Sequence, residues 1–111
     1  MFAISTEEIQ ALFDKELAKA NEHNSPFHSA HEGYSVLLEE VEEVSTEFGN
    51  LTFRTKNIWN LVKEDEKFLK LQLEEEKRIT IELIKEAIQV GAMCDKFLNY
   101  LDTKKEGKQN V

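Results

Sequence analysis

The sequence has few of the residues that make turns and cross-links. Its 111 residues include one proline, four glycines and one cysteine, Cys94. A single cysteine excludes a disulfide or a thiolate metal cluster within one chain, and apolar helical neighbours favour an inert, buried thiol. So few glycines and prolines argue against a β-sandwich, a barrel or a glycine-rich phosphate loop. We therefore predict an all-α protein, a bundle of about four helices with a long C-terminal helix.

Long apolar runs and a surplus of basic residues are also absent. No run approaches the roughly 20 apolar residues that a membrane helix needs, so we expect no membrane partner. The N-terminus lacks the basic-then-apolar layout of a secretion signal, which favours a cytoplasmic location. The net charge of −8, from 22 acidic and 14 basic residues, repels phosphate backbones. We therefore expect no nucleic acid partner.

Capping and turn residues indicate where the helices begin and end. Ser5 and Glu8 have the spacing of a capping box at the start of a first helix, which Asn24-Ser25-Pro26 ends. A second helix is predicted from His28 or Ser29 to about Phe48, with Gly49-Asn50 at its C-terminus. The remaining predictions are a loop and a short helix over residues 51–65 and, from about Glu66 to Asp102, one long helix or two helices with a kink between them.

The predicted last helix is apolar on more than one side. A helix of this kind is buried on several faces, which in a small domain favours self-association as a homodimer or homotetramer. Gly91 and Ala92 would let another helix approach closely. The alternative is that both stripes are covered within one chain. The two stripes are Leu83, Val90, Cys94, Phe97 and Leu101, and Ile81, Ile84, Ile88 and Ala92.

We predict a single domain over residues 1–103 and a flexible charged tail over 104–111.

Glutamates crowd one turn of the second predicted helix. Five of the eleven residues from Leu37 to Glu47 are glutamates, beside an unbroken apolar stripe. Like charges at three- and four-residue spacing repel unless a cation lies between them. Glu82, Glu86 and Gln89 share one face of the last helix, and antiparallel packing would bring the two sets together. Hard oxygen ligands of this kind suit Mg²⁺ or Mn²⁺, although glutamate-rich turns are also common solvated surfaces.

Two segments carry a resemblance to a known family. The run His31-Glu32-Gly33-Tyr34, leading into Leu37-Leu38-Glu39-Glu40-Val41-Glu42-Glu43, resembles the MazG-like nucleotide pyrophosphohydrolases of the all-α NTP pyrophosphatase superfamily. It is most similar to the small bacterial and phage forms. The run from Lys85 to Met93 is similar to the last helix of those forms. The resemblance covers roughly Pro26 to Phe48 and Glu82 to Leu98, about a third of the chain.

The resemblance implies Mg²⁺-dependent hydrolysis of a nucleoside triphosphate to the monophosphate and pyrophosphate. In that family the metal is held by E-E-x-x-E on one helix and E-x-x-D on another. Carried over, Glu39, Glu40 and Glu43 are the expected catalytic and metal-binding set, and Glu86 begins the second motif. Gln89 occupies the position where the family has aspartate, so we expect weaker metal binding and weaker activity. Glu82 is a further candidate ligand.

Other polar and aromatic residues are weaker candidates for the substrate site. His31 and Tyr34 precede the first glutamate motif, and Lys85, Lys96 and Arg78 are candidate phosphate partners on or near the acidic face. Each has an ordinary structural explanation: a histidine near a helix start, a core aromatic, or a solvated surface charge. His28 and His31 have no third ligand at zinc spacing.

A non-catalytic protein is the alternative from a different class. Loss of the expected aspartate and the doubly apolar last helix both favour a bundle retained for self-assembly or partner binding. The two hypotheses differ in whether the glutamates hold a metal ion.

Overall fold

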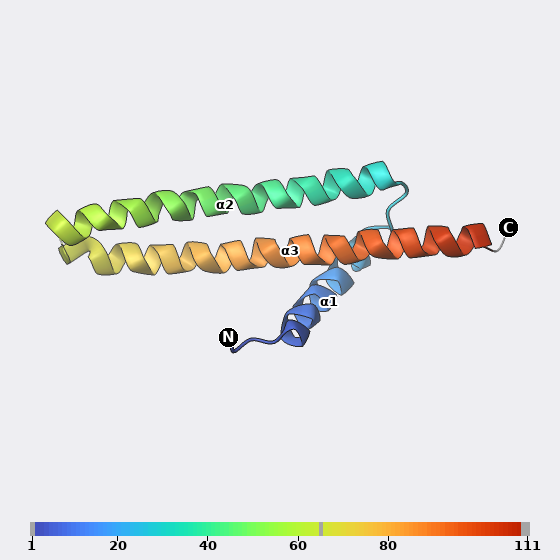
Figure 1. The fold of residues 1–111 in the computed structure, drawn as a ribbon, viewed down its shortest axis with the longest axis horizontal. Helices are drawn as coiled ribbons and strands as arrows, with labels where there is room; N and C mark the ends of the chain where they lie inside the picture. The colour runs from blue at the N-terminus through green and yellow to red at the C-terminus, as the bar shows by residue number, and fades with distance from the viewer. Residues whose placement is uncertain (1, 65, 110–111) are drawn as a thin grey trace. The chain divides into compact units, whose positions relative to one another are not determined.

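A computed structural model describes residues 2–64 and 66–109, with side chains as far as Lys104. Within this part of the chain there are three α-helices, one 3-10 turn and no strand (Figure 1). The all-α prediction is confirmed, whereas three α-helices stand where about four were expected. The elements are α1 Thr6–His23, α2 Ala30–Glu64, η1 Glu66–Phe68 and α3 Leu69–Gln109.

The predicted ends of α1 and the start of α2 are confirmed by their capping bonds. The Ser5 hydroxyl accepts from the Glu8 backbone N–H at 3.1 Å, and the Glu8 carboxylate accepts from the Ser5 N–H at 3.1 Å. This reciprocal pair satisfies two backbone donors that the first turn leaves free. Asn24 caps the other end through its backbone N–H and side-chain amide, which both donate to the Ala20 carbonyl. Ser29 accepts from the Glu32 N–H at 3.1 Å and begins α2.

The predicted end of this helix at Gly49-Asn50 is wrong. α2 continues through Gly49 to Glu64, and no described glycine has a positive φ. The reason is a repeat that runs past Gly49, because half-buried residues recur at alternating spacings of three and four. Such a heptad pattern keeps one helix face against a partner helix. Its half-buried positions in this part of α2 are Val44, Glu47, Leu51, Arg54, Ile58 and Leu61.

The long last helix is confirmed and extends further than predicted. α3 runs unbroken from Leu69 to Gln109, after the short 3-10 turn. Its backbone therefore stays helical into the predicted tail at 104–111, of which residues 110–111 lie outside the described part. The flexibility of that tail stays a prediction. None of the described helices has a long, nearly uncharged apolar stretch of the kind that spans a membrane.

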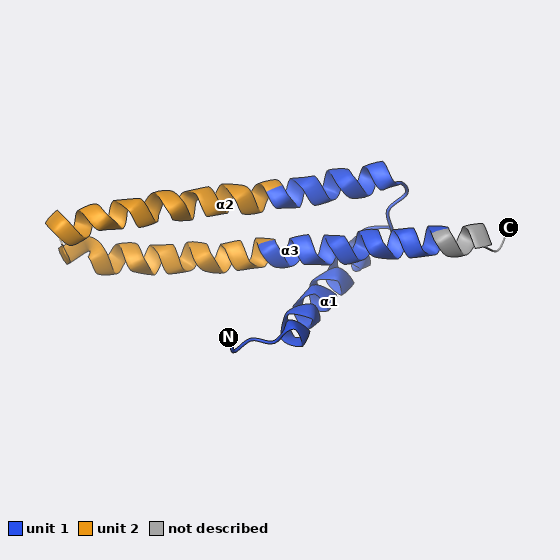
Figure 2. Cartoon of the chain, viewed as in Figure 1, with its two compact units in different colours: residues 1–41, 87–111 blue, residues 42–86 orange. Residues whose placement is uncertain are grey.

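The chain divides into two compact units (Figure 2). The first unit comprises Met1–Val41 and Ala87–Val111, and its core is formed by Phe27, Ala92 and Met93. α1 and α3 approach closely there, because a Cβ added at Gly91 would overlap the ring of Phe13. The close approach expected at Gly91 and Ala92 is thus made within the chain, and Ala92 has no exposed surface.

The second unit, Glu42–Glu86, is a pair of antiparallel helical segments whose contact layer mixes apolar and polar side chains. Arg54 donates to Gln72 at 3.2 Å, and the Thr55 hydroxyl donates to Glu76 at 2.9 Å. Ile79 is the only buried hydrophobic residue that this unit contributes among those described. Several large apolar side chains face solvent instead, at 47–67% exposure: Phe48, Phe53, Trp59, Val62, Phe68, Leu71, Leu73, Ile81 and Ile84.

Candidate metal centre

Two carboxylates meet within the second unit, one from each helix. A carboxylate oxygen of Glu43 on α2 and one of Glu86 on α3 lie within 4.8 Å of each other. The antiparallel register that pairs Arg54 with Gln72 also brings these two positions together. The contact that sequence reasoning expected between the two acidic motifs is present at this pair.

Glu40 extends this pair along α2. It precedes Glu43 by one helical turn, and oxygens of these two neighbours also lie within 4.8 Å of each other. Glu40 and Glu86 are half-buried and Glu43 is exposed. Three of the predicted ligands therefore supply a local concentration of negative charge.

The donor set fits a hard divalent cation. It consists of carboxylate oxygens, which Mg²⁺ and Mn²⁺ prefer, and lacks the imidazole and thiolate groups that favour Zn²⁺. Ligands on one Mg²⁺ lie about 2.1 Å from the ion, so their oxygens are about 3–4 Å apart. Small rotamer changes of exposed or half-buried glutamates are enough to reach that spacing from 4.8 Å.

Two other predicted ligands lie outside this group. Glu39 is exposed on α2. Glu82 is half-buried and accepts a hydrogen bond from the Lys85 ammonium at 3.3 Å. Lys85 therefore has a local partner one turn away, which matches the ordinary surface explanation for that residue. Its predicted role in substrate binding stays a prediction.

Gln89 has a partner that sequence reasoning missed. In the first unit its side-chain amide donates to the carboxylate of Glu16 on α1. Glu16 lies on the apolar face of α1, three residues after Phe13 and four after Leu12. A charged residue at such a position was a visible signal, because it predicts a polar partner on the opposing helix.

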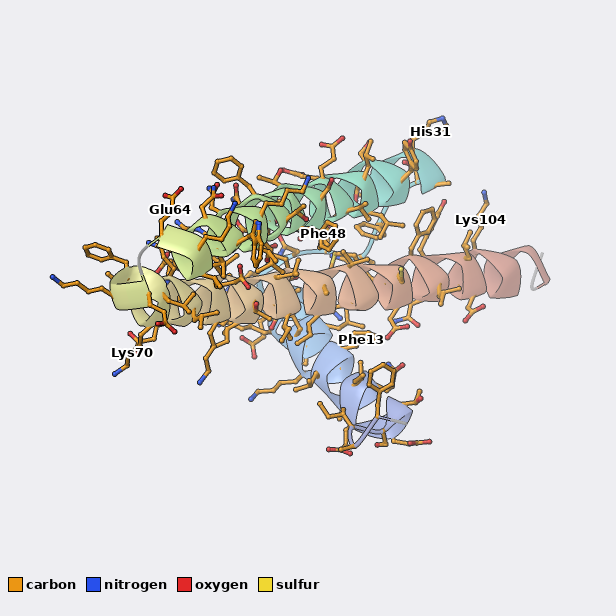
Figure 3. The ribbon with its side chains drawn as sticks, turned by 60° about the vertical axis from the view of Figure 1, so that its left-hand side comes forward. Phe13, His31, Phe48, Glu64, Lys70 and Lys104 are labelled. Atoms are coloured by element: carbon orange, nitrogen blue, oxygen red, sulfur yellow. The ribbon has the colours of Figure 1, made fainter. Side chains whose placement is uncertain are left out.

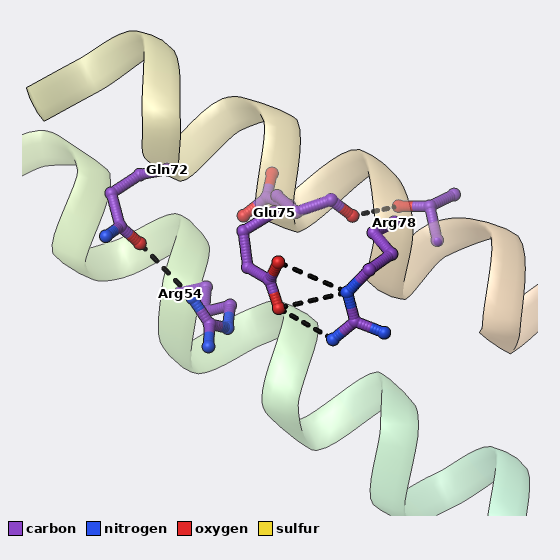
Figure 4. Close-up of polar contacts among 6 residues, drawn as sticks. Arg54, Gln72, Glu75 and Arg78 are labelled. Atoms are coloured by element: carbon purple, nitrogen blue, oxygen red, sulfur yellow. Dashed lines mark hydrogen bonds and ion pairs between the residues drawn. The ribbon is translucent and has the colours of Figure 1, made fainter.

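A polar groove of about 590 Å³ opens in the second unit, and Glu86 is one of its lining residues. Its walls combine acidic, basic and amide groups with one aromatic ring. Arg54 and Arg78 lie in this groove. Arg78 was a candidate phosphate partner from the sequence, whereas Arg54 was not predicted to be functional. Figure 4 shows their polar contacts with Gln72 and Glu75. The lining residues are Glu47, Asn50, Phe53, Arg54, Asn57, Gln72, Arg78, Ile79, Glu82 and Glu86.

Arg78 forms a two-pronged ion pair one turn along α3. Its guanidinium donates to both oxygens of Glu75, at 2.6 and 3.1 Å. These hydrogen bonds lower the pKa of the Glu75 carboxyl and raise the pKa of Arg78. Because the pair is near solvent, a phosphate is able to compete with Glu75 for this guanidinium.

The remaining predicted substrate residues are dispersed. His31 lies at the first turn of α2 and is exposed (Figure 3). Tyr34 is 61% exposed, so the explanation of a core aromatic does not hold for it. Lys96 is buried in the first unit, with its ammonium 4.7 Å from the centre of the Phe27 ring. Cys94 is exposed, and the expectation of a buried thiol is wrong.

Comparison with known proteins adds no further assignment. No family model, curated protein or solved structure matches this chain.

Proposed function

We propose that this protein is a divalent-cation-dependent hydrolase that converts a nucleoside triphosphate, in the ribo or deoxy form, to the monophosphate and pyrophosphate. The observation that carries the proposal is the approach of Glu43 and Glu86 from facing helices, with Glu40 one turn before Glu43. The resemblance of His31-Glu32-Gly33-Tyr34 and the following glutamates to MazG-like enzymes supports the same activity.

The donor chemistry assigns the metal-binding residues. Glu40, Glu43 and Glu86 would hold Mg²⁺ or Mn²⁺, and Glu82 would complete or orient the shell. When bound, the cation neutralises phosphate charge and makes a coordinated water more acidic. The glutamates would also position the attacking water and the phosphates, and catalysis would rest on charge neutralisation and alignment.

The groove supports a nucleotide as the substrate. Arg54 and Arg78 offer guanidinium groups to phosphate oxygens, a geometry that binds phosphate through paired hydrogen bonds. Asn50 and Asn57 offer amide donors and acceptors, and Phe53 offers an aromatic face for a base. A volume of about 590 Å³ lies within the range of small-ligand sites.

Pyrophosphate release across a panel of ribo- and deoxynucleoside triphosphates tests the proposal. We expect turnover of at least one nucleotide with Mg²⁺ or Mn²⁺, none with a chelator, and a loss of about 100-fold or more in Glu40→Gln. The substitution keeps the size of the side chain and removes its charge. Activity that survives in Glu40→Gln contradicts the site assignment, and no turnover across the panel contradicts the activity.

The second candidate is a non-catalytic helical protein that assembles through its apolar surface. The exposure of Phe53, Trp59 and Ile84 in the second unit favours it. This hypothesis predicts that neither Mg²⁺ nor Mn²⁺ raises the melting temperature and that Glu40→Gln is neutral or stabilising. The expected homodimer or homotetramer and the cytoplasmic location are compatible with both candidates.

A further inference from the structure

A second cavity, of about 520 Å³, lies wholly within the first unit and has a different chemistry from the glutamate cluster. Residues from the end of α1, the loop after it and the last turns of α3 line it. None of its described lining residues is acidic, and two are lysines. In a chain with a net charge of −8, this is a local reversal of sign. The lining residues are Asn21, Asn24, Pro26, Phe27, Lys96, Asn99, Tyr100, Thr103 and Lys104.

Lys96 is the unusual group in this cavity. It is 8% exposed and is the buried charged residue of the described part. Its ammonium lies 4.7 Å from the centre of the Phe27 ring, and no carboxylate among the described residues forms a salt bridge with it. The ammonium is not sealed from solvent, because no buried side-chain nitrogen of the described residues lacks a hydrogen-bond partner. An anion entering the cavity would pair with this charge in surroundings that screen it less than bulk water does.

The surrounding residues hold Lys96 in place. Phe27 is buried and meets Phe97 edge-to-face at 6.1 Å between centroids, and Phe97 in turn contacts Tyr100 at 6.4 Å. Asn24 donates its side-chain amide to the Ala20 carbonyl, which fixes the direction of that side chain. The cavity is therefore bounded by packed aromatic rings and a helix end, which limits the reorganisation that binding requires.

The polar groups indicate which anion fits. Lysine ammonium groups act as point charges that suit phosphate, whereas no arginine is present to form a planar fork with a carboxylate. Asn21, Asn99 and Thr103 offer neutral donors for further phosphate or sugar oxygens. Pro26, Phe27 and Tyr100 provide an apolar surface for the organic part of the ligand.

We propose that this cavity binds a small phosphate ester, with the phosphate beside Lys96 and Lys104 and the organic group against Phe27 and Tyr100. Figure 3 shows Lys104 on the last part of α3. The site is independent of the proposed hydrolase centre, since Lys96 lies ten residues beyond Glu86 on α3 and the two share no lining residue.

Side-chain amide signals from nuclear magnetic resonance provide the test, recorded on the full chain in chelator-containing buffer. The probes are adenosine monophosphate, inorganic phosphate and adenosine. We expect the first two to shift the amide signals of Asn21, Asn24 and Asn99, and adenosine at the same concentration to leave them unchanged. Absence of shifts with adenosine monophosphate up to millimolar concentrations overturns the proposal, as does equal binding of adenosine.

Matched variants assign the charge responsible. Lys96→Gln should weaken adenosine monophosphate binding roughly tenfold or more, because the variant loses a charged hydrogen-bond donor to the phosphate. Lys96→Arg should retain most of the affinity, and Lys56→Gln, at an exposed lysine outside the cavity, should bind as the natural sequence does. If Lys96→Gln does not fold by circular dichroism, the exposed Lys104→Gln serves, with an expected loss of about threefold or more. Unchanged affinity in the folded cavity variant overturns the proposal, and Glu40→Gln should leave this binding intact whatever its effect on hydrolysis.

Discussion

Several polar residues of the second unit lie at positions where two packed helices usually have leucine. Glu47 and Arg54 lie at half-buried heptad positions of α2, and Gln72, Glu76 and Glu86 lie at such positions of α3. Charged groups at these positions weaken the contact unless they are paired or bind a ligand. Arg54 and Glu76 are paired with Gln72 and Thr55, respectively. These polar residues therefore contribute to the packing of the two helices, and several of them line the candidate groove.

Gln89 shows why aspartate, the residue of the MazG-like motif at this position, is expected to destabilise the chain unless Glu16 is also changed. Its amide donates to Glu16, and Gln89→Asp replaces that hydrogen bond with two facing negative charges. We expect Gln89→Asp to lower the unfolding free energy by roughly 1–2 kcal/mol. The double variant Glu16→Gln with Gln89→Asp should recover most of it, because it restores an amide facing a carboxylate. Thermal unfolding measures both. Equal stability of Gln89→Asp and the natural sequence would count against the pairing.

The Glu75–Arg78 pair predicts a pH-dependent contribution to stability. Arg78 lowers the pKa of the Glu75 carboxyl in the folded chain, so this contribution is fully present above the ordinary carboxyl pKa. It is lost as the pH falls through the lowered pKa, where the folded carboxyl takes up its proton. We expect the melting temperature of Arg78→Gln to be lower than that of the natural sequence at pH 7 and equal to it at about pH 2. A difference in melting temperature that persists at low pH would contradict this origin.

At the scale of whole elements, the sequence predicted α1 and α3 better than α2. Capping residues such as Ser5 and Asn24 act locally, so their bonds follow from neighbouring residues. The continuation of α2 past Gly49 depends on contacts with a distant segment of the chain. The heptad repeat is not apparent as an apolar pattern in the sequence, because charged residues, Glu47 and Arg54, occupy two of its positions. Glycine alone was a weak reason to end the helix.

Two glycines in helices predict opposite effects of one substitution. A Cβ added at Gly49 meets nothing within 4 Å, so Gly49→Ala should raise the unfolding free energy by roughly 0.5–1 kcal/mol through helix propensity. At Gly91 the added Cβ overlaps the ring of Phe13, so Gly91→Ala should displace α1 and destabilise the first unit. Chemical denaturation compares the two. Stabilisation by both substitutions would contradict the close approach of α1 and α3.

For the molecule as a whole, the large exposed apolar surface favours association with a second copy. Trp59 is 60% exposed and Ile84 53% exposed, and monomeric proteins seldom leave many such side chains in water. The expectation that Ile81 and Ile84 form part of an association surface stays a prediction. Gly91, unlike these isoleucines, is covered by Phe13 of the same chain and is therefore not part of the expected association surface.

Sedimentation provides the test of that surface. Ile84→Asp places a charge where apolar contact is expected, so it should reduce the sedimenting mass to that of a monomer while leaving the helix content unchanged. Ile4→Asp, at an equally exposed apolar position before α1, is the matched control and should not change the mass. An unchanged, well-folded assembly in Ile84→Asp would rule this surface out.

The acidic residues of the candidate site could be named from the sequence, but their arrangement could not. Glu40, Glu43 and Glu86 were predicted ligands that group together. Glu39, by contrast, is exposed and lies outside this group. Of the two arginines in the groove, Arg78 was a candidate phosphate partner from the sequence. Arg54 was missed, since it is distant in sequence and lines the same groove as Glu86 only through the antiparallel register.

Binding of Mn²⁺, followed by electron paramagnetic resonance in the absence of nucleotide, tests the central claim most directly. The natural sequence should reduce the signal of free Mn²⁺ in a saturable way. Glu86→Gln should weaken that binding about tenfold or more, because one of three carboxylate charges is lost, and Glu39→Gln should weaken it far less. Equal binding by the natural sequence and Glu86→Gln, or no saturable binding at all, would contradict the proposal that these glutamates form a metal centre.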